Sequence, residues 1–329
     1  MLQANRARTG LALALLSAAT FGTSGTFARV LIDAGWSPGA AVTIRITIAA
    51  VILAVSAILM LRGKWHVLRR NFGMVAIYGL VAIAGCQVFY FNAVQHLSVG
   101  VALLLEYMGV VLVVGWLWLR SGQTPRRLTI AGSFVAIVGL VFVLDLIGDA
   151  QIDVVGVLWG LGAAVGLAVF FILSARSDSE LPPLAMASGG MTIGAVTLIV
   201  LGALGLLPMQ ANTDEVDFAG QQVSWLVPVL GLSVVAAALA YVVGISAARI
   251  LGSKLSSFIG LTEVLFAVFF AWLFLGQLPT LMQFVGGVLI IAGVALVRID
   301  ELRAPAEDLG IPAGLDPVVG DASSESGRG

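Results

Sequence analysis

The chain has 329 residues, of which 60% are hydrophobic and 11% charged, and its formal net charge is −1. A soluble domain carries about 25% charged residues, so this composition excludes a water-soluble globular protein, and the net charge gives no support for nucleic-acid binding. The single cysteine, Cys86, excludes an internal disulfide and a cysteine-based metal site; we interpret it as a small apolar packing residue. We therefore expect an integral membrane protein.

A helix needs about 20 apolar residues to cross the bilayer core. The sequence contains ten such runs, at residues 10–30, 39–61, 72–94, 99–119, 127–147, 154–174, 184–207, 224–247, 254–275 and 281–299. The first run follows two arginines, as in a secretory signal, but it stays apolar for too long and we interpret it as a permanent span. Residues 300–329 are rich in Pro, Gly, Ser and acidic residues and are predicted to form a disordered tail.

The distribution of charges predicts the orientation in the membrane. If the amino terminus is cytoplasmic and there are ten spans, all but two of the 17 Lys and Arg residues lie in cytoplasmic segments, the exceptions being Arg29 and Arg45. The opposite loops carry acidic residues, which are Asp33, Asp145, Asp149, Asp153, Asp214, Glu215 and Asp217. This is the positive-inside pattern. It predicts a multi-pass protein of the plasma or inner membrane with both termini in the cytoplasm.

An internal repeat predicts how the spans are arranged. Residues 93–143 align without a gap on 247–297, and both segments contain the pattern Trp-Leu-x-x-Gly-Gln-x-Pro. Each repeat holds five spans, an odd number, so the second copy enters the membrane inverted. We predict an all-α fold of ten transmembrane helices in two inverted five-helix repeats, residues 1–148 and 149–299. Inverted repeats are typical of secondary transporters, whose site lies near the midplane between the halves.

Several short motifs resemble a known family. They are Phe21-Gly22-Thr23-Ser24, Thr43-Ile44-Arg45, the segment Ala-Val-Gln-His-Leu-Ser-Val-Gly at 93–100, and Leu-Gly-Gln-x-Pro at 275–279. Together they are similar to the EamA-type transporters of the drug/metabolite transporter (DMT) superfamily. In the last motif Gln277 replaces the glutamate usual in that family, and Gln123 does so in the first repeat. The resemblance implies a ten-helix fold around a central cavity and the export of small metabolites, often amino acids.

Three ionisable side chains fall within the predicted spans, where charge is costly and functional sites are expected. Arg45 and Glu106 are each predicted to lie roughly 10 Å below the outer surface, so a buried ion pair is feasible, either as a gate or substrate-recognition pair or as a structural link. Glu263 is predicted near the midplane and is equivalent by the repeat to Gly109, so the two acids are not symmetry mates. Either glutamate is a candidate for a coupling proton.

Neutral polar residues complete the candidate site. Thr20 and Ser24 belong to a polar face of the first span, and Gln87 and Asn92 lie in the outer half of the third. Gln87 is equivalent to Tyr241 by the repeat. Contacts between helices are the alternative role for all of these residues.

These features favour a secondary transporter that exports an amino acid or related small metabolite with proton coupling. No G-x-x-x-x-G-K-[ST] loop is present for nucleotide binding. Two histidines and one cysteine give little support for a membrane-embedded enzyme, and we expect no metal and no cofactor. A structural or sensor protein without transport remains the alternative. The expected partners are a small-molecule substrate, the bilayer and a coupling proton, and the oligomeric state stays open.

Overall fold

A computed structural model describes residues 2–97, 99–121, 125–143, 153–176, 180–276 and 278–302. In the first half of the chain the elements are α1 (Leu2–Asp33), α2 (Pro38–Met60), α3 (Trp65–Arg70), α4 (Phe72–Ile77), η1 (Tyr78–Gly85), α5 (Cys86–His96), α6 (Val99–Tyr107), α7 (Gly109–Ser121) and α8 (Arg127–Val143). Gln123, Gln277 and the predicted tail beyond residue 302 lie outside the described residues.

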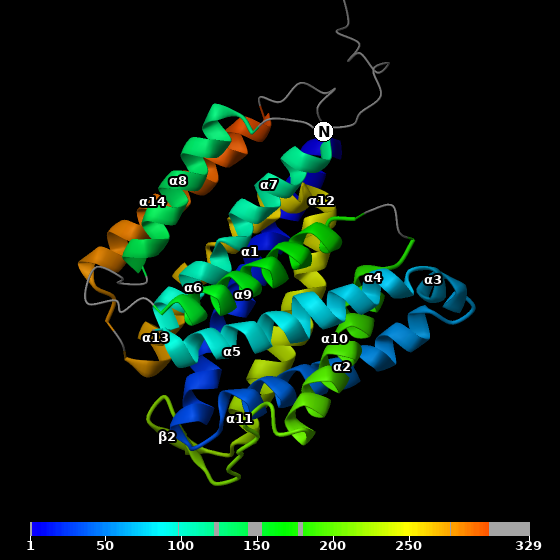
Figure 1. Cartoon of the computed structure of the whole chain (residues 1–329), viewed down its shortest axis with the longest axis vertical. Helices are drawn as coiled ribbons and strands as arrows, with labels where there is room; N and C mark the ends of the chain where they lie inside the picture. Colours follow the sequence, from blue (N-terminus) through cyan, green and yellow to red (C-terminus); the bar gives the residue numbers. More distant parts are fainter. Residues whose placement is uncertain are drawn as a thin grey trace, which may run out of the picture.

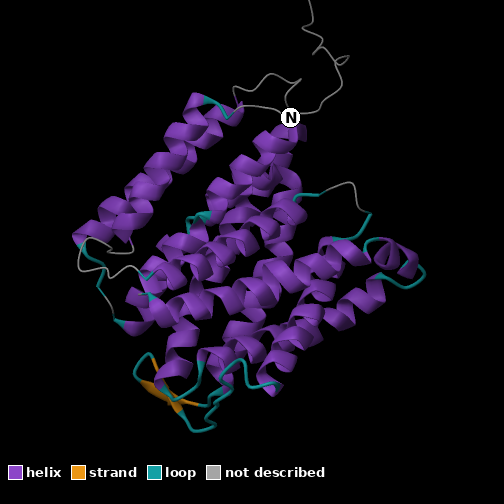
Figure 2. Ribbon diagram, in the orientation of Figure 1, coloured by secondary structure: helices purple, strands orange, loops and turns teal. Residues whose placement is uncertain are grey.

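The second half repeats this order with one addition. Its elements are α9 (Val154–Ser174), α10 (Pro183–Ala203), β1 (Val216–Phe218), β2 (Gln221–Val223), α11 (Leu226–Leu230), η2 (Gly231–Leu239), α12 (Ala240–Gly260), α13 (Glu263–Leu275) and α14 (Leu281–Leu302). Helices therefore dominate, as predicted. The antiparallel β1–β2 hairpin, which the sequence analysis did not predict, lies at the end of the molecule remote from the amino terminus (Figure 2).

Eight helices in the described part of the chain are long and apolar enough to span a membrane, and α8 and α13 are shorter apolar helices. One of the eight covers Leu226–Gly260, 35 residues, and so contains the predicted eighth span and the start of the ninth. Gly252 interrupts this helix with φ 80° and ψ 166°. Only glycine adopts such a backbone readily, so the boundary between the two predicted spans is a kink at one residue rather than a loop.

Irregular helical geometry recurs at the repeat spacing of 154 residues. The π-helical segments η1 and η2 occupy equivalent positions, and the helices that follow them start at Cys86 and Ala240. Breaks at Met108 and at Leu261–Thr262 precede the equivalent helices α7 and α13. The two halves therefore share backbone details that hydrophobicity alone does not specify.

The equivalent helices α8 and α14 form a close pair along one edge of the molecule (Figure 1). A Cβ added to Gly132 would lie 2.7 Å from the Gly293 carbonyl oxygen, and one added to Gly139 would lie 2.7 Å from the Gly286 carbonyl oxygen. The earlier glycine of each helix thus faces the later glycine of its partner, so the two helices run antiparallel. Small residues permit this close approach in membranes, and the register fits repeats of opposite orientation.

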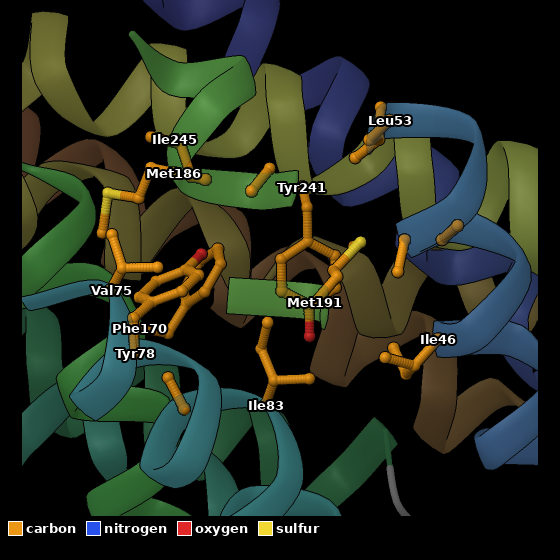
Figure 3. Packing of buried hydrophobic residues seen from close by; sticks show 14 of the residues in the cluster. Ile46, Leu53, Val75, Tyr78, Ile83, Phe170, Met186, Met191, Tyr241 and Ile245 are labelled. Atoms are coloured by element: carbon orange, nitrogen blue, oxygen red, sulfur yellow. The ribbon is translucent and has the colours of Figure 1, made fainter. Parts of the chain in front are cut away.

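The largest buried cluster joins α2, η1, α9, α10 and α12. Figure 3 shows Tyr78 and Phe170 lying against each other beside Tyr241, with Met186 and Met191 from α10 packed around them. The ring centroids of Tyr78 and Phe170 are 5.9 Å apart. This cluster fixes the wall from which Phe170 and Tyr241 reach the central cavity.

Candidate functional site: a charged central cavity

A cavity of about 810 Å³ lies between the two halves of the chain. Its wall includes residues of α1 from Ala14 to Ile32, and α2, η1, α5, α6, α9, α12 and α13 supply most of the rest. Toward the amino-terminal end, α1 and α12 are in close contact. A Cβ added to Gly10 of α1 would lie 2.7 Å from the side chain of Ile250 on α12. The cavity therefore extends from the middle of the molecule toward the end that carries the β-hairpin (Figure 1).

Arg45 lies on α2 and is 7% exposed. Its Nη2 donates a hydrogen bond of 2.6 Å to the carbonyl oxygen of Ala236 in the π-helical segment η2. Its Nε is buried and has no hydrogen-bond partner among the described residues. The guanidinium is therefore held by one neutral acceptor, and the Arg45 side chain lines the cavity.

Glu106 lies at the end of α6, two residues before the helix break, and lines the cavity. The Cys86 thiol donates to its Oε1 at 3.3 Å and to the Ala163 carbonyl oxygen at 3.5 Å. The Arg45–Glu106 ion pair that the sequence made feasible is not formed within the described residues, although the two charges are close enough to interact electrostatically. Arg45 instead donates to the Ala236 carbonyl oxygen.

Glu263 is the first residue of α13, directly after the break, and it also lines the cavity. Its position in the first turn suits the positive end of the helix dipole. The Tyr107 hydroxyl lies within hydrogen-bonding reach of its carboxyl, and Glu106 and Arg45 are close enough to interact with it. All three intramembrane charges therefore belong to one cavity.

The neutral candidates divide into two groups. Gln87, Tyr241 and Ser24 line the cavity, whereas Thr20 and Asn92 do not. Thr20 Oγ1 donates to the Leu16 carbonyl oxygen at 2.8 Å, and Asn92 Nδ2 donates to the Val88 carbonyl oxygen at 2.8 Å. Each side chain therefore donates its hydrogen bond to the carbonyl oxygen four residues earlier in its own helix, as short polar side chains often do.

Two kinds of residue in this wall were not recognised from the sequence. Phe21 and Phe170 pack edge-on against Tyr241, with ring centroids 5.0 and 5.5 Å away. Cys86, expected to be apolar packing, instead contacts Glu106. Phe21 stands in one of the family motifs, but in a chain so rich in apolar residues no sequence signal separates a wall aromatic from a packing one. The described residues bring together no three His, Cys, Asp or Glu side chains that could hold a metal.

The fold and the cavity define a multi-pass membrane protein built from two related halves. The EamA-like transporter family matches residues 8–145 and again residues 154–299. The chain therefore belongs to the EamA-like transporter family, which is a family of transporters rather than of enzymes.

Some relatives match most of the chain and others match part of it. A Salmonella typhimurium protein named as the uncharacterized inner membrane transporter YicL is 22% identical over 90% of this chain and 97% of its own length. A protein of Streptantibioticus cattleyicolor named as a probable terminal-alkyne amino-acid exporter is 30% identical over 77% of this chain and 82% of its own. The threonine/homoserine exporter RhtA of Escherichia coli is 29% identical over 39% of this chain and 41% of its own. A solved crystal structure, 17% identical, covers 90% of this chain and 99% of its own with a TM-score of 0.73, so the fold is shared.

Proposed function

We propose that this protein is a secondary transporter that exports an amino acid or a related small metabolite across the inner or plasma membrane with proton coupling. The observation that carries the proposal is the cavity between the halves, which gathers Arg45, Glu106 and Glu263 in one wall. Charged side chains in a membrane are costly and mark substrate or ion pathways. Relatives named as exporters of amino-acid compounds support the substrate class and the direction.

The cavity offers complementary groups for a zwitterion. The guanidinium of Arg45 suits a carboxylate, and the carboxyls of Glu106 and Glu263 suit an amino group. A carboxyl that binds an amino group in one state and a proton in another would couple the two movements. Gln87, Tyr241 and Ser24 would supply neutral hydrogen bonds and an aromatic surface.

The same proposal includes ten spans and cytoplasmic termini. The kink at Gly252 would separate the eighth and ninth spans. The shorter helix α13 would then complete the ninth span, and α8 would form the fifth. The breaks before α7 and α13 divide the fourth and ninth spans near the cavity, where half-helices can tilt independently.

Thiol labelling tests the topology. His66→Cys and Asp214→Cys, each in a Cys86→Ser background, are labelled in intact cells with a membrane-impermeant reagent. We expect labelling at position 214 from outside and at position 66 only after the cells are permeabilised. Labelling of both positions from the same side would contradict the ten-span arrangement.

Counterflow in proteoliposomes tests the transport. The vesicles are loaded with individual amino acids and small metabolites, with and without a pH gradient, and uptake of the labelled compound is followed. We expect exchange of an amino acid that the gradient accelerates, and slower exchange in Glu106→Gln. Well-folded protein that exchanges nothing would favour a structural or sensor role instead.

A further inference from the structure

The charges inside the cavity do not balance. The interior contains one guanidinium, that of Arg45, and two carboxyls, those of Glu106 and Glu263. Arg29 also reaches the cavity, but it is exposed near the wide end and already pairs with Asp33 at 2.8 Å. With all three interior groups ionised, the cavity has a net charge of −1.

Neutral hydrogen bonds leave this imbalance in place. The partner of Arg45 is a backbone carbonyl and that of Glu106 is a thiol, and the Tyr107 hydroxyl lies near the carboxyl of Glu263. No ion pair reaches any of the three in the described part of the chain. The two carboxyls lie close enough to repel each other, and a buried charge without a counter-charge is strongly unfavourable.

The repeat-equivalent positions do not supply a balancing set. The positions equivalent to Glu106 and Glu263 are Gly260 and Gly109, and neither has room for a side chain. A Cβ would lie 2.9 Å from the Phe171 ring at Gly260 and 2.6 Å from the Ala164 carbonyl oxygen at Gly109. The balancing positive charge therefore comes either from a cationic ligand or from a proton on one of the two carboxyls.

We propose that the substrate is a diamino acid with a net positive charge, whose carboxylate binds Arg45 and whose two ammonium groups bind Glu106 and Glu263. This inference rests on the proposed transport function. Each charge of such a ligand meets one opposite charge in the cavity, whereas a neutral amino acid leaves one carboxylate unpaired. The faces of Phe21 and Tyr241 give the aliphatic stem and a neighbouring ammonium an apolar, cation-attracting surface.

The competing arrangement is a neutral amino acid with a proton on one glutamate, and the two make different predictions about substrate preference. Wild-type protein is reconstituted and counterflow of labelled ornithine and of labelled leucine is compared at neutral pH. We expect ornithine to exchange at least about tenfold faster, the ratio given by about 1.4 kcal/mol of additional interaction. Equal rates for the two compounds would overturn the diamino acid while leaving transport itself intact. The absence of any exchange would overturn both proposals.

Charge-neutralising variants test whether the interior carboxyls cause the preference for ornithine over leucine. Glu263→Gln removes one interior carboxyl, so we expect the ornithine-to-leucine ratio to fall about tenfold toward unity. Glu106→Gln, reconstituted separately, provides a second test if the first variant does not give a monodisperse protein. Glu215→Gln is the matched control because it removes an exposed carboxyl on the loop at the hairpin end, and its ratio should equal that of wild type. A ratio that is unchanged in both interior variants would overturn the proposal.

Discussion

The two repeats have equivalent backbone geometry, but their intramembrane charged side chains differ. Equivalent π-helical segments and equivalent helix breaks occur in both halves. The charged side chains do not follow this symmetry, because Arg45, Glu106 and Glu263 correspond to glycines in the other repeat. The pairs are Arg45 with Gly190, from the aligned helix starts Pro38 and Pro183, Glu106 with Gly260, and Gly109 with Glu263.

Neighbouring residues occupy the space at these glycines. Tyr78 of η1 covers Gly190, where a Cβ would lie 2.5 Å from its ring, and α9 covers both Gly260 and Gly109. The charged residues of the pairs, Arg45, Glu106 and Glu263, instead line the cavity, whose wall includes α1. The two halves therefore have equivalent helix breaks, whereas each intramembrane charge is present in only one of them. Changing either member of a pair should therefore have a different kind of effect.

The largest effect is expected at a filled glycine. In Gly109→Leu the new side chain meets the Ala164 backbone, which cannot move away as a flexible side chain can. Overpacking of this kind costs about 1–3 kcal/mol and sometimes more, so we expect a clear fall in melting temperature and in the yield of monodisperse protein. Gly115→Leu on the same helix is the control, since nothing lies within 4 Å of its Cβ position. Similar losses in both variants would show that packing at the repeat-equivalent position is not special.

The next effect concerns the charge of Arg45 rather than the fold. Arg45→Gln keeps a donor that can reach the Ala236 carbonyl but removes the positive charge, so we expect transport to fall by about tenfold or more with little change in melting temperature. Arg29→Gln removes an exposed, already paired arginine and should retain most of the wild-type rate. Equal rates for Arg45→Gln and wild type would separate Arg45 from substrate recognition.

A smaller effect is expected at the hairpin, the element that one repeat has and the other lacks. Phe218 stacks on Phe274 of α13 and on Phe27 of α1, with ring centroids 5.5 and 5.7 Å away. Phe218→Ala frees the ends of these helices, so we expect a change of about two- to fivefold in transport rate and a normal yield. Phe284→Ala, at a side chain that is 70% exposed, is the control. If both variants have the same rate, the hairpin does not restrain α13.

The smallest effect is expected at the start of α9. Asp153 caps this helix by accepting a 2.7 Å hydrogen bond from the Val155 amide, and His96 lies 3.2 Å from it. The bond from Val155 is the largest contribution to a lowered pKa of the Asp153 carboxyl, and its ionised form therefore stabilises the fold at neutral pH. That contribution is lost as the pH falls through the folded-state pKa. Asp153→Asn keeps the cap without the charge, so its melting temperature should be slightly lower at neutral pH and should converge with wild type in acid. A difference that grows in acid would contradict this sign.

Many of the helices could be predicted because lipid is the solvent around them. Lipid demands long apolar helices, so several predicted spans match the helices closely, as 154–174 does for α9 and 39–61 does for α2. The gapless alignment of 93–143 with 247–297 has the same offset of 154 residues that separates the starts of α7 and α13 and of α8 and α14. The cost of intramembrane charge selected Arg45, Glu106 and Glu263, all of which line one cavity.

The remaining features depend on three-dimensional contacts that no local pattern encodes. Equal predicted depth made an Arg45–Glu106 pair feasible, but depth alone does not specify contact, and Arg45 donates to a carbonyl oxygen of η2. Thr20 and Asn92 have suitable chemistry but bond to their own helices. The contact between Cys86 and Glu106 likewise comes from tertiary packing.

Chemical modification of the cavity carboxyls tests the central claim most directly. Purified protein is treated with a hydrophobic carbodiimide, with and without a saturating transported compound, and the modified residues are located by mass spectrometry. The account predicts that Glu106 and Glu263 are modified and that the transported compound protects both, while a compound that is not transported protects neither. Modification of these two residues at an unchanged rate in the presence of the transported compound would show that the substrate binds elsewhere.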